Sequence, residues 1–158
     1  MPDDATGCRR SVIAIRDAAA TDEGAWRRLW RGYVTFYDAD VPAAVTDATW
    51  RRVLESDTAL ACRLAEVDGS IVGFSICVLH AGTWTVAPVC YLEDLFVDPT
   101  ARRHGVGAAL LTDLIDRGRA LGWSRLYWHT RSGNAAARRL YDRFAAADDF
   151  VRYRLFLD

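Results

Sequence analysis

The 158-residue sequence contains no lysine, because all 20 of its basic residues are arginines. It also lacks an apolar run long enough to cross a bilayer, since charged residues interrupt the hydrophobic 51% at short intervals. The start, Met1-Pro2-Asp3-Asp4, has no apolar core of the kind that a signal peptide needs. We therefore expect a cytoplasmic protein that does not associate with membranes.

Other absences exclude further classes of protein. The four cysteines are widely spaced with no CxxC pair, and the three histidines are scattered, so we expect buried free thiols and no metal site. The net charge of −1 predicts no binding to nucleic acid or to an anionic membrane. The length fits one domain, and there is no repeat or Pro/Ser-rich linker. We expect a flexible leader over residues 1–10 and one folded domain over 11–158.

Periodicity in the sequence indicates ten helices and strands. Alternating or β-prone apolar runs predict strands at 12–16, 59–67, 70–79, 89–97, 125–130 and 150–157. Asp68-Gly69 between two of them is a strong hairpin signal. Helical spacing predicts helices at 21–37, 47–54, 107–121 and 134–146. The order β-α-α-β-β-β-α-β-α-β predicts an α/β (α+β) fold, a mixed sheet covered by helices.

A glycine-bearing basic loop follows the fourth strand and precedes a long helix: Arg102-Arg103-His104-Gly105-Val106-Gly107-Ala108. The first N–H groups of a helix have no intrahelical partner and carry the positive end of its dipole, so an anion fits there. Glycines let a phosphate approach the main chain, and arginines grip its oxygens. The loop alone is equally compatible with an ordinary turn that has a solvated basic rim.

Three segments together carry a family resemblance. They are Tyr91-Leu92-Glu93-Asp94-Leu95-Phe96-Val97, then Arg102-x-x-Gly105-x-Gly107-Ala108, then Asn134-x-x-Ala137-x-x-Leu140-Tyr141. The chain resembles the GNAT superfamily of acyl-CoA-dependent N-acetyltransferases. Its motif residues most resemble those of the spermidine/spermine and small histone/polyamine-type branch. The resemblance implies a single GNAT-like domain with a mostly antiparallel sheet, acetyl-CoA as cofactor with CoA as product, and a homodimer.

The sequence departs from the family pattern at two places. Many relatives have glycine where this chain has Arg103, and many end the last helix with Gly-Phe where it has Asp149-Phe150. Arg103 still offers a backbone N–H, and aspartate tolerates left-handed geometry better than most residues. Neither departure removes a catalytic candidate.

The catalytic candidates are Glu93 and Tyr141. A carboxylate is unexpected in an apolar strand, and the resemblance implies that Glu93 accepts the ammonium proton directly or through water; the alternative is a structural ion pair or helix cap. Strand alternation places Asp94 on the opposite face, in a structural role. Periodicity alone assigns Tyr141 to the core, whereas the resemblance implies that it protonates the leaving sulfur.

The resemblance also implies a cofactor site. A bulge in the strand frees main-chain groups at Leu95, Phe96 and Val97 for the pantetheine and for the developing oxyanion. Asn134 is expected both to cap its helix and to contact the CoA arm. Arg143 is either a phosphate contact or part of a solvated face. The full set expected to bind the cofactor is Leu95, Phe96, Val97, Arg102, Arg103, His104, Gly105, Val106, Gly107, Ala108, Asn134, Ala137 and Arg143.

The acceptor is less defined by the sequence. Aromatic faces and nearby carboxylates attract an ammonium group, which nominates Tyr33, Tyr37, Asp38 and Trp84, whereas Trp26, Leu29 and Trp30 have the spacing of plain core residues. We expect direct transfer to a primary amine of a small molecule such as a polyamine or an amino acid. Protein lysines or N-termini are the alternative acceptors, and a non-catalytic acyl-CoA sensor is the alternative of another class.

Overall fold

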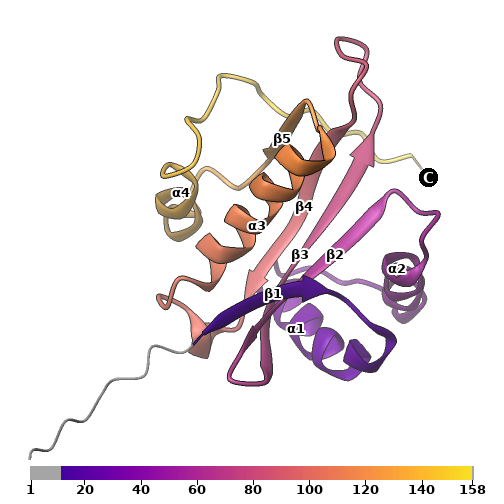
Figure 1. Ribbon diagram of the computed structural model, residues 1–158, viewed down its shortest axis with the longest axis vertical. Helices are drawn as coiled ribbons and strands as arrows, with labels where there is room; N and C mark the ends of the chain where they lie inside the picture. The colour runs from indigo at the N-terminus through magenta and orange to yellow at the C-terminus, as the bar shows by residue number, and fades with distance from the viewer. Residues whose placement is uncertain (1–11, 158) are drawn as a thin grey trace, which may run out of the picture.

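The computed structural model describes residues 12–157, so the expected leader at 1–10 lies outside the described part (Figure 1). The strands are β1 (Ile13–Asp17), β2 (Leu60–Val67), β3 (Ser70–His80), β4 (Val89–Val97) and β5 (Arg125–Trp128). The helices are α1 (Glu23–Phe36), α2 (Ala43–Leu54), α3 (Val106–Leu121) and α4 (Ala135–Tyr141). Two short 3-10 turns, Ala20–Asp22 and Pro99–Ala101, precede α1 and follow β4.

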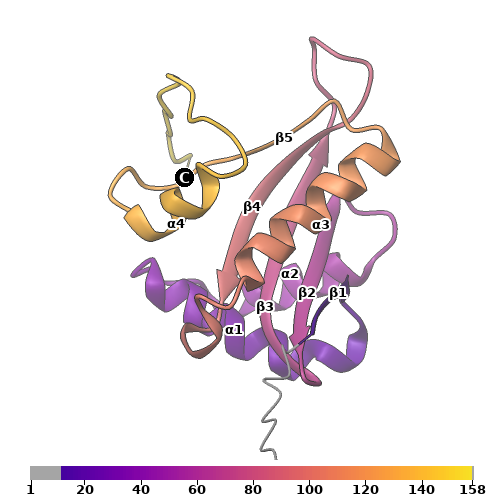
Figure 2. The same ribbon diagram turned by 60° about the vertical axis from the view of Figure 1, so that its left-hand side comes forward.

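The five strands form one sheet in the order β1-β2-β3-β4-β5. All neighbours are antiparallel except β4 and β5, which run parallel. Helix α3 covers one face of the sheet, while α1 and α2 cover the other (Figure 2). This architecture confirms the expected mixed, mostly antiparallel sheet flanked by helices. The hairpin at Asp68-Gly69 is also confirmed, with both residues at positive φ as its tight turn requires.

Each face of the sheet has its own apolar core. On the α1 side, Trp26 stacks between Trp30 and Trp50 at centroid distances of 5.2 and 5.0 Å, against Phe74 and Phe96. On the α3 side, the helix inserts Leu110, Leu111 and Leu114. The thiols of Cys62, Cys77 and Cys90 are buried and free, as predicted, whereas Cys8 lies outside the described residues. Over residues 12–157 there is no cluster suited to a metal ion and no helix long and apolar enough for a membrane span.

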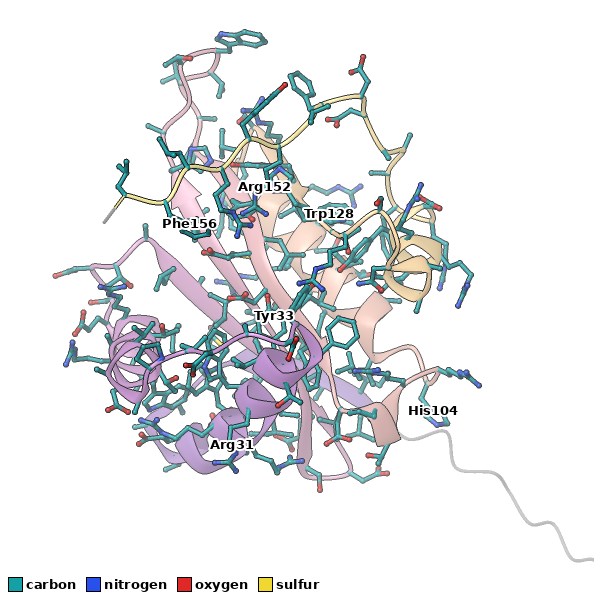
Figure 3. The ribbon with its side chains drawn as sticks, turned by 180° about the vertical axis from the view of Figure 1, so that it is seen from behind. Arg31, Tyr33, His104, Trp128, Arg152 and Phe156 are labelled. Carbon is teal, nitrogen blue, oxygen red and sulfur yellow. The ribbon has the colours of Figure 1, made fainter. Side chains whose placement is uncertain are left out.

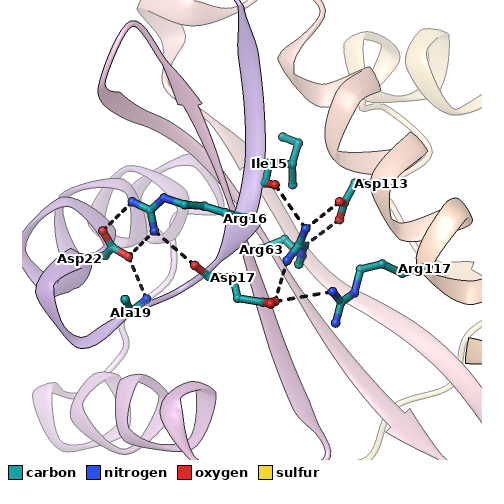
Figure 4. Close-up of polar contacts among 8 residues, drawn as sticks. All are labelled: Ile15, Arg16, Asp17, Ala19, Asp22, Arg63, Asp113 and Arg117. Atoms are coloured by element: carbon teal, nitrogen blue, oxygen red, sulfur yellow. Dashed lines mark hydrogen bonds and ion pairs between the residues drawn. The ribbon is translucent and has the colours of Figure 1, made fainter. Parts of the chain in front are cut away.

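A network of ion pairs joins β1, β2 and α3 (Figure 4). The guanidinium of Arg63 on β2 donates through Nε and Nη2 to both carboxylate oxygens of Asp113 on α3, each at 2.8 Å. Its Nη1 lies 2.7 Å from Asp17 of β1, and Arg117 approaches the same carboxylate at 3.8 Å. Because the Arg63 side chain is only 9% exposed, this network locks one side of the sheet to α3.

Two helix boundaries differ from the sequence prediction. Helix α2 begins at Ala43 rather than at 47, because the Pro42 carbonyl accepts the N–H groups of Val45 and Thr46. Helix α4 ends at Tyr141 rather than near 146, because the N–H groups of Arg143 and Phe144 donate to carbonyls only three residues back, those of Leu140 and Tyr141, which tightens the chain into a turn.

The predicted last strand, 150–157, is wrong as a strand. This segment follows α4 and crosses the face of the sheet that carries α1 (Figure 3) without joining a ladder among the described residues. Its large apolar side chains are exposed, with Tyr153 at 93%. A segment with strand propensity forms a strand only where it can hydrogen-bond to the edge of another strand. Residues 150–157 cross the sheet and do not pair with β5.

Candidate active site

Strands β4 and β5 part at the middle of β4. Their parallel pairing covers only Val89–Leu92 against Arg125–Trp128. On the other edge, Asp94 pairs with Ile76 and Leu92 with Cys77, so Glu93 is the extra residue of a β-bulge. From Glu93 onward no strand among residues 12–157 lies beside the β4 edge on the β5 side. This is the strand separation that the family resemblance implies, and it exposes peptide groups of residues 93–96 on this edge to a ligand, whereas the Val97 carbonyl accepts from the Arg102 Nε.

The bulge brings Glu93 and Asp94 into one cleft. Strand alternation predicted Asp94 on the opposite face, and that placement is wrong, because the extra residue cancels the alternation. The structural role assigned to Asp94 stays a prediction. Burial raises the pKa of the Asp94 carboxyl to about 6, and the neighbouring Tyr33 hydroxyl partly opposes this shift. Glu93 is exposed at the same cleft. Two carboxyl groups therefore face the space at the end of the strand pairing.

Tyr141 forms another wall of this cleft. It lies at the C-terminal end of α4, and its ring meets Trp128 of β5 edge-on at 5.5 Å. Burial raises the pKa of its phenol to about 12, so the hydroxyl stays protonated at neutral pH. Tyr141 packs against the core on one side and lines the cleft on the other. Its position is therefore compatible both with the core residue that periodicity predicts and with a residue of the site.

The cleft has a volume of about 1190 Å³ and is lined mainly by aromatic and charged side chains. Tyr33 of α1 (Figure 3) and Tyr37, the residue directly after this helix, line the cleft, as the sequence predicted. Asp38 is exposed at a positive φ just beyond α1 and does not line it, and Trp84, 93% exposed, lies in the β3–β4 loop away from it.

Sequence reasoning missed an aromatic cluster in the same cleft. Tyr91 stacks on Tyr127 at 5.1 Å, and His129 Nδ1 lies 3.4 Å from the Tyr91 hydroxyl. The parallel register that pairs Tyr91 with Tyr127 across β4 and β5 creates this cluster. Period-2 alternation in each segment was the available signal, but it does not reveal which strands are neighbours.

The start of α3 offers unpaired backbone donors. Gly105 precedes the helix at φ +87°, and the first recorded bond at this end runs from the Ala109 N–H to the Gly105 carbonyl at 2.9 Å. The N–H groups of residues 106–108 therefore have no acceptor among the described residues, which fits an anion. A Cβ on Gly107 would lie 3.0 Å from Leu140, so this glycine also lets α4 pack closely on α3.

The side chains of the basic loop are arranged differently from what the sequence predicted. The Arg102 Nε donates to the Val97 carbonyl at 3.0 Å, and its guanidinium lies 5.5 Å from the Phe96 ring centroid. It is thus turned back onto β4 rather than toward the helix start. Arg103 and His104 are exposed, and Arg103 has φ +68°, a left-handed conformation that explains why glycine suits this position in relatives.

The remaining cofactor candidates lie along β4, α3 and α4. The side chains of Phe96 and Val106 are in the core, so only their backbones are available to a ligand, while Leu95, Val97 and Ala108 are partly or fully buried. The Asn134 Oδ1 accepts from the Ala137 N–H at 3.3 Å, which confirms the predicted helix cap. Arg143 is exposed in the turn after α4.

Residues 23–146 match the model of the acetyltransferase (GNAT) family. This chain belongs to that family. It is 33% identical over 144 residues to the D-amino-acid N-acetyltransferase of Saccharomyces cerevisiae, covering 90% of this chain and 89% of the relative. It is also 33% identical over 85 residues to the [ribosomal protein bS18]-alanine N-acetyltransferase of Escherichia coli strain K12, 54% and 53% of the two chains.

The fold agrees with solved GNAT structures. The aminoglycoside N-acetyltransferase AAC(6')-Iy in complex with CoA superimposes with a TM-score of 0.71 at 25% identity, covering 92% of this chain and 95% of that one. As a member of the GNAT family, this chain uses acetyl-CoA. The open β4 edge and the free N–H groups at the start of α3 fit such a ligand. The finer resemblance to the spermidine/spermine branch stays a prediction.

Proposed function

We propose that this acetyltransferase moves the acetyl group directly to a primary amine of a small molecule, with Glu93 as base and Tyr141 as acid. One observation carries the proposal. The Glu93 carboxyl group from β4 and the Tyr141 phenol from α4 line the same cleft, at the point where β4 and β5 part. A base and an acid from different elements thus face one space, as amine acetylation requires.

Each side chain has a separate chemical task. Bound acetyl-CoA supplies the acetyl thioester. Glu93 accepts a proton from the acceptor ammonium, directly or through water, and Tyr141 donates its proton to the departing sulfur. A backbone N–H near Leu95 on the open β4 edge stabilises the developing oxyanion. The three buried cysteines do not line the cleft, and burial raises the pKa of Cys62 to about 12, so direct transfer is favoured over a covalent acetyl-enzyme.

The proposed cofactor path runs from the cleft to the start of α3. The open edge at Leu95, Phe96 and Val97 pairs with the pantetheine, and residues 103–108 hold the pyrophosphate through backbone N–H groups. The exposed side chains of Arg103 and His104 add positive charge at the same place. In this proposal Asn134, Ala137 and Arg143 flank the path, and Arg102 acts by fixing Val97.

A small acceptor is supported by the cover over the cleft. Residues 150–152 and Arg154 line the cleft, and the segment that carries them crosses the α1 face of the sheet after α4 (Figure 3). Tyr33, Tyr37 and Asp94 provide the aromatic faces and the carboxyl group that suit an ammonium. The yeast relative, named for D-amino acids, acts on a small amine. The E. coli relative, named for a protein alanine, makes a protein N-terminus the alternative acceptor.

The test measures CoA release over a panel of polyamines, amino acids, aminoglycosides and peptides. We expect Glu93→Gln and Tyr141→Phe each to lower kcat by about 10²–10⁴-fold without lowering Tm. The matched control is Glu55→Gln, which alters an exposed glutamate after α2. Full activity and an unchanged pH profile in both variants contradict the mechanism. If no acceptor reacts while CoA still raises Tm, the chain is an acyl-CoA-binding module instead.

A further inference from the structure

The cleft holds arginines as well as carboxyl groups. Arg131 from the β5–α4 loop and Arg152 from the segment after α4 line it together with Glu93 and Asp94. Some arginines of the molecule lie beside carboxylates, as Arg16, Arg27, Arg28 and Arg63 do. Within residues 12–157, no carboxylate lies within ion-pair distance of Arg131 or Arg152. Their charges are therefore available to a ligand.

Arg131 is held in place at the rim of the cleft. Its Nη2 donates to the Tyr37 carbonyl at 3.2 Å, and its guanidinium carbon lies 5.1 Å from the centroid of the Tyr37 ring. Tyr37 in turn meets the Tyr33 ring edge-on at 5.0 Å, and Tyr33 interacts with Asp94. Arg131 is thus positioned before any ligand arrives, with guanidinium N–H groups to spare.

Arg152 comes from another part of the chain, the segment after α4. Its side chain lies on the same face of the sheet as Tyr33 (Figure 3), and it lines the cleft. Arg152 and Glu93 act with opposite sign on the phenol of Tyr91, which is within electrostatic reach of both. The lining of the cleft therefore carries charges of both signs. Its carboxyl groups belong to Glu93, Asp94, Asp142 and Asp148, and its guanidinium groups belong to Arg131, Arg138, Arg152 and Arg154.

This distribution of charge fits a zwitterion. A polyamine carries only positive charges and offers nothing to the arginines of the lining, whereas an amino acid carries an ammonium for the carboxyl groups and a carboxylate for the arginines. Arginine is the side chain best suited to a carboxylate, because its planar fork donates two parallel hydrogen bonds. We infer that the acceptor is an amine that bears a carboxylate, an amino acid, and that Arg131 and Arg152 determine this specificity by binding the carboxylate. The inference rests on the proposed function, since it assumes that the amine is acetylated in this cleft.

The test compares acceptors that differ only in the carboxylate. Both enantiomers of leucine and phenylalanine, their amides, and spermidine are offered to the wild-type protein, to Arg131→Gln, to Arg152→Gln and to the double variant. We expect the wild type to prefer the acids over the amides by about 10–100-fold in kcat/KM, the value of a charged hydrogen-bonded contact. Each single variant loses about 10-fold on the acids through KM and nothing on the amides.

A matched control and a second measurement separate folding from specificity. Arg139→Gln removes an exposed arginine of α4 that does not line the cleft, and it keeps the wild-type preference. An N-acetylamino acid, the product, raises the Tm of the wild type and fails to raise that of the double variant, while CoA stabilises both.

Two results overturn the inference, and they differ from failure of the proposed function. Equal kcat/KM for acids and amides, or faster reaction of spermidine, means that acetyl transfer occurs without carboxylate recognition. An undiminished preference in the double variant means that other residues bind the carboxylate. If no amine on the panel is acetylated by any variant, the proposed function fails, and the inference fails with it.

Discussion

The two edges of the sheet differ in whether their polar groups are paired within the fold. On the β1–β2 side, Arg63 is bound by Asp113 and Asp17, so its charge is neutralised within the fold. On the β4–β5 side, the strands separate at the Glu93 bulge and leave backbone edges, carboxyl groups and arginines without such partners among the described residues. One side of the same sheet is stabilised by its polar groups, and the other keeps them for a ligand.

The titration of carboxyl groups shows the same contrast. Two hydrogen bonds from Arg16, at 2.7 and 2.9 Å, lower the pKa of Asp22, so its charged form stabilises the folded state. That contribution is present above the ordinary pKa near 3.8 and is lost as the pH falls through the lowered value. Burial raises the pKa of Asp94, so its charged form is a cost to folding.

The largest effect is expected from removing the ion pairs of Arg63 on the β1–β2 side, which we call the closed side because its charges are paired within the fold. Arg63→Met leaves Asp113 and Asp17 beside an apolar side chain, and we expect the free energy of unfolding to fall by about 3–5 kcal/mol. The control Arg117→Met removes only the longer contact of 3.8 Å to Asp17 and costs about 1 kcal/mol or less. Urea denaturation measures both. A further Asp113→Leu change restores much of the loss, and a loss below 1 kcal/mol for Arg63→Met contradicts the role of the network.

A gain in stability is expected from neutralising Asp94 on the β4–β5 side, which we call the open side because its strands separate there. The folded pKa of Asp94, about 6, lies above the ordinary value of 3.8, so the folded state binds more protons between these pH values, and stability falls as the pH rises through that window. We expect Asp94→Asn to raise the free energy of unfolding at pH 7.5 by about 1–2 kcal/mol, and by much less at pH 4.

Thermal unfolding at the two pH values measures this effect, with Asp57→Asn at an exposed position as control. Acetyl transfer by Asp94→Asn is expected to fall at the same time, because the cleft loses a charge that attracts the ammonium. Equal or lower stability of the variant at pH 7.5 shows that Asp94 is already balanced by its surroundings, like the carboxylates of the closed side.

The smallest effect is expected at the start of α3. Arg103→Gly relieves a left-handed conformation, and we expect a gain of about 1 kcal/mol in the free energy of unfolding. The same change weakens CoA binding if the Arg103 side chain contacts phosphate. Arg103→Ala separates the two effects, since it removes the charge and keeps the strain. Calorimetry measures both the unfolding of the variants and their affinity for CoA. An unchanged Tm for Arg103→Gly contradicts the expectation that the left-handed conformation of Arg103 is strained.

The sequence predicted most elements because local signals and tertiary structure agree there. Asp68-Gly69 forms the expected hairpin, and Gly122 ends α3 at φ +70° as a helix C-cap. Asp94 was misplaced because a bulge depends on the register of two strands, which one strand does not encode. The segment 150–157 was misassigned because its strand pattern has no ladder to join among the described residues.

The candidate site was predicted in part for the same reason. Glu93 and Tyr141, which the motifs nominated, and Tyr33 and Tyr37, which the aromatic helix face nominated, line one cleft. The cluster of Tyr91, Tyr127 and His129 arises from parallel pairing of segments far apart in the chain. Long-range electrostatics at Arg131 and Arg152 were equally hidden, because loops position both residues.

The bulge at Glu93 also makes β4 sensitive to its length. Cys90 and Leu92 before the bulge and Leu95 and Val97 after it all pack on the α3 side, although the two pairs differ in parity. Deleting one residue between Leu92 and Leu95 would restore unbroken alternation and turn one pair out of its core. The length of β4 therefore has to be kept for both faces of the strand to meet their own cores.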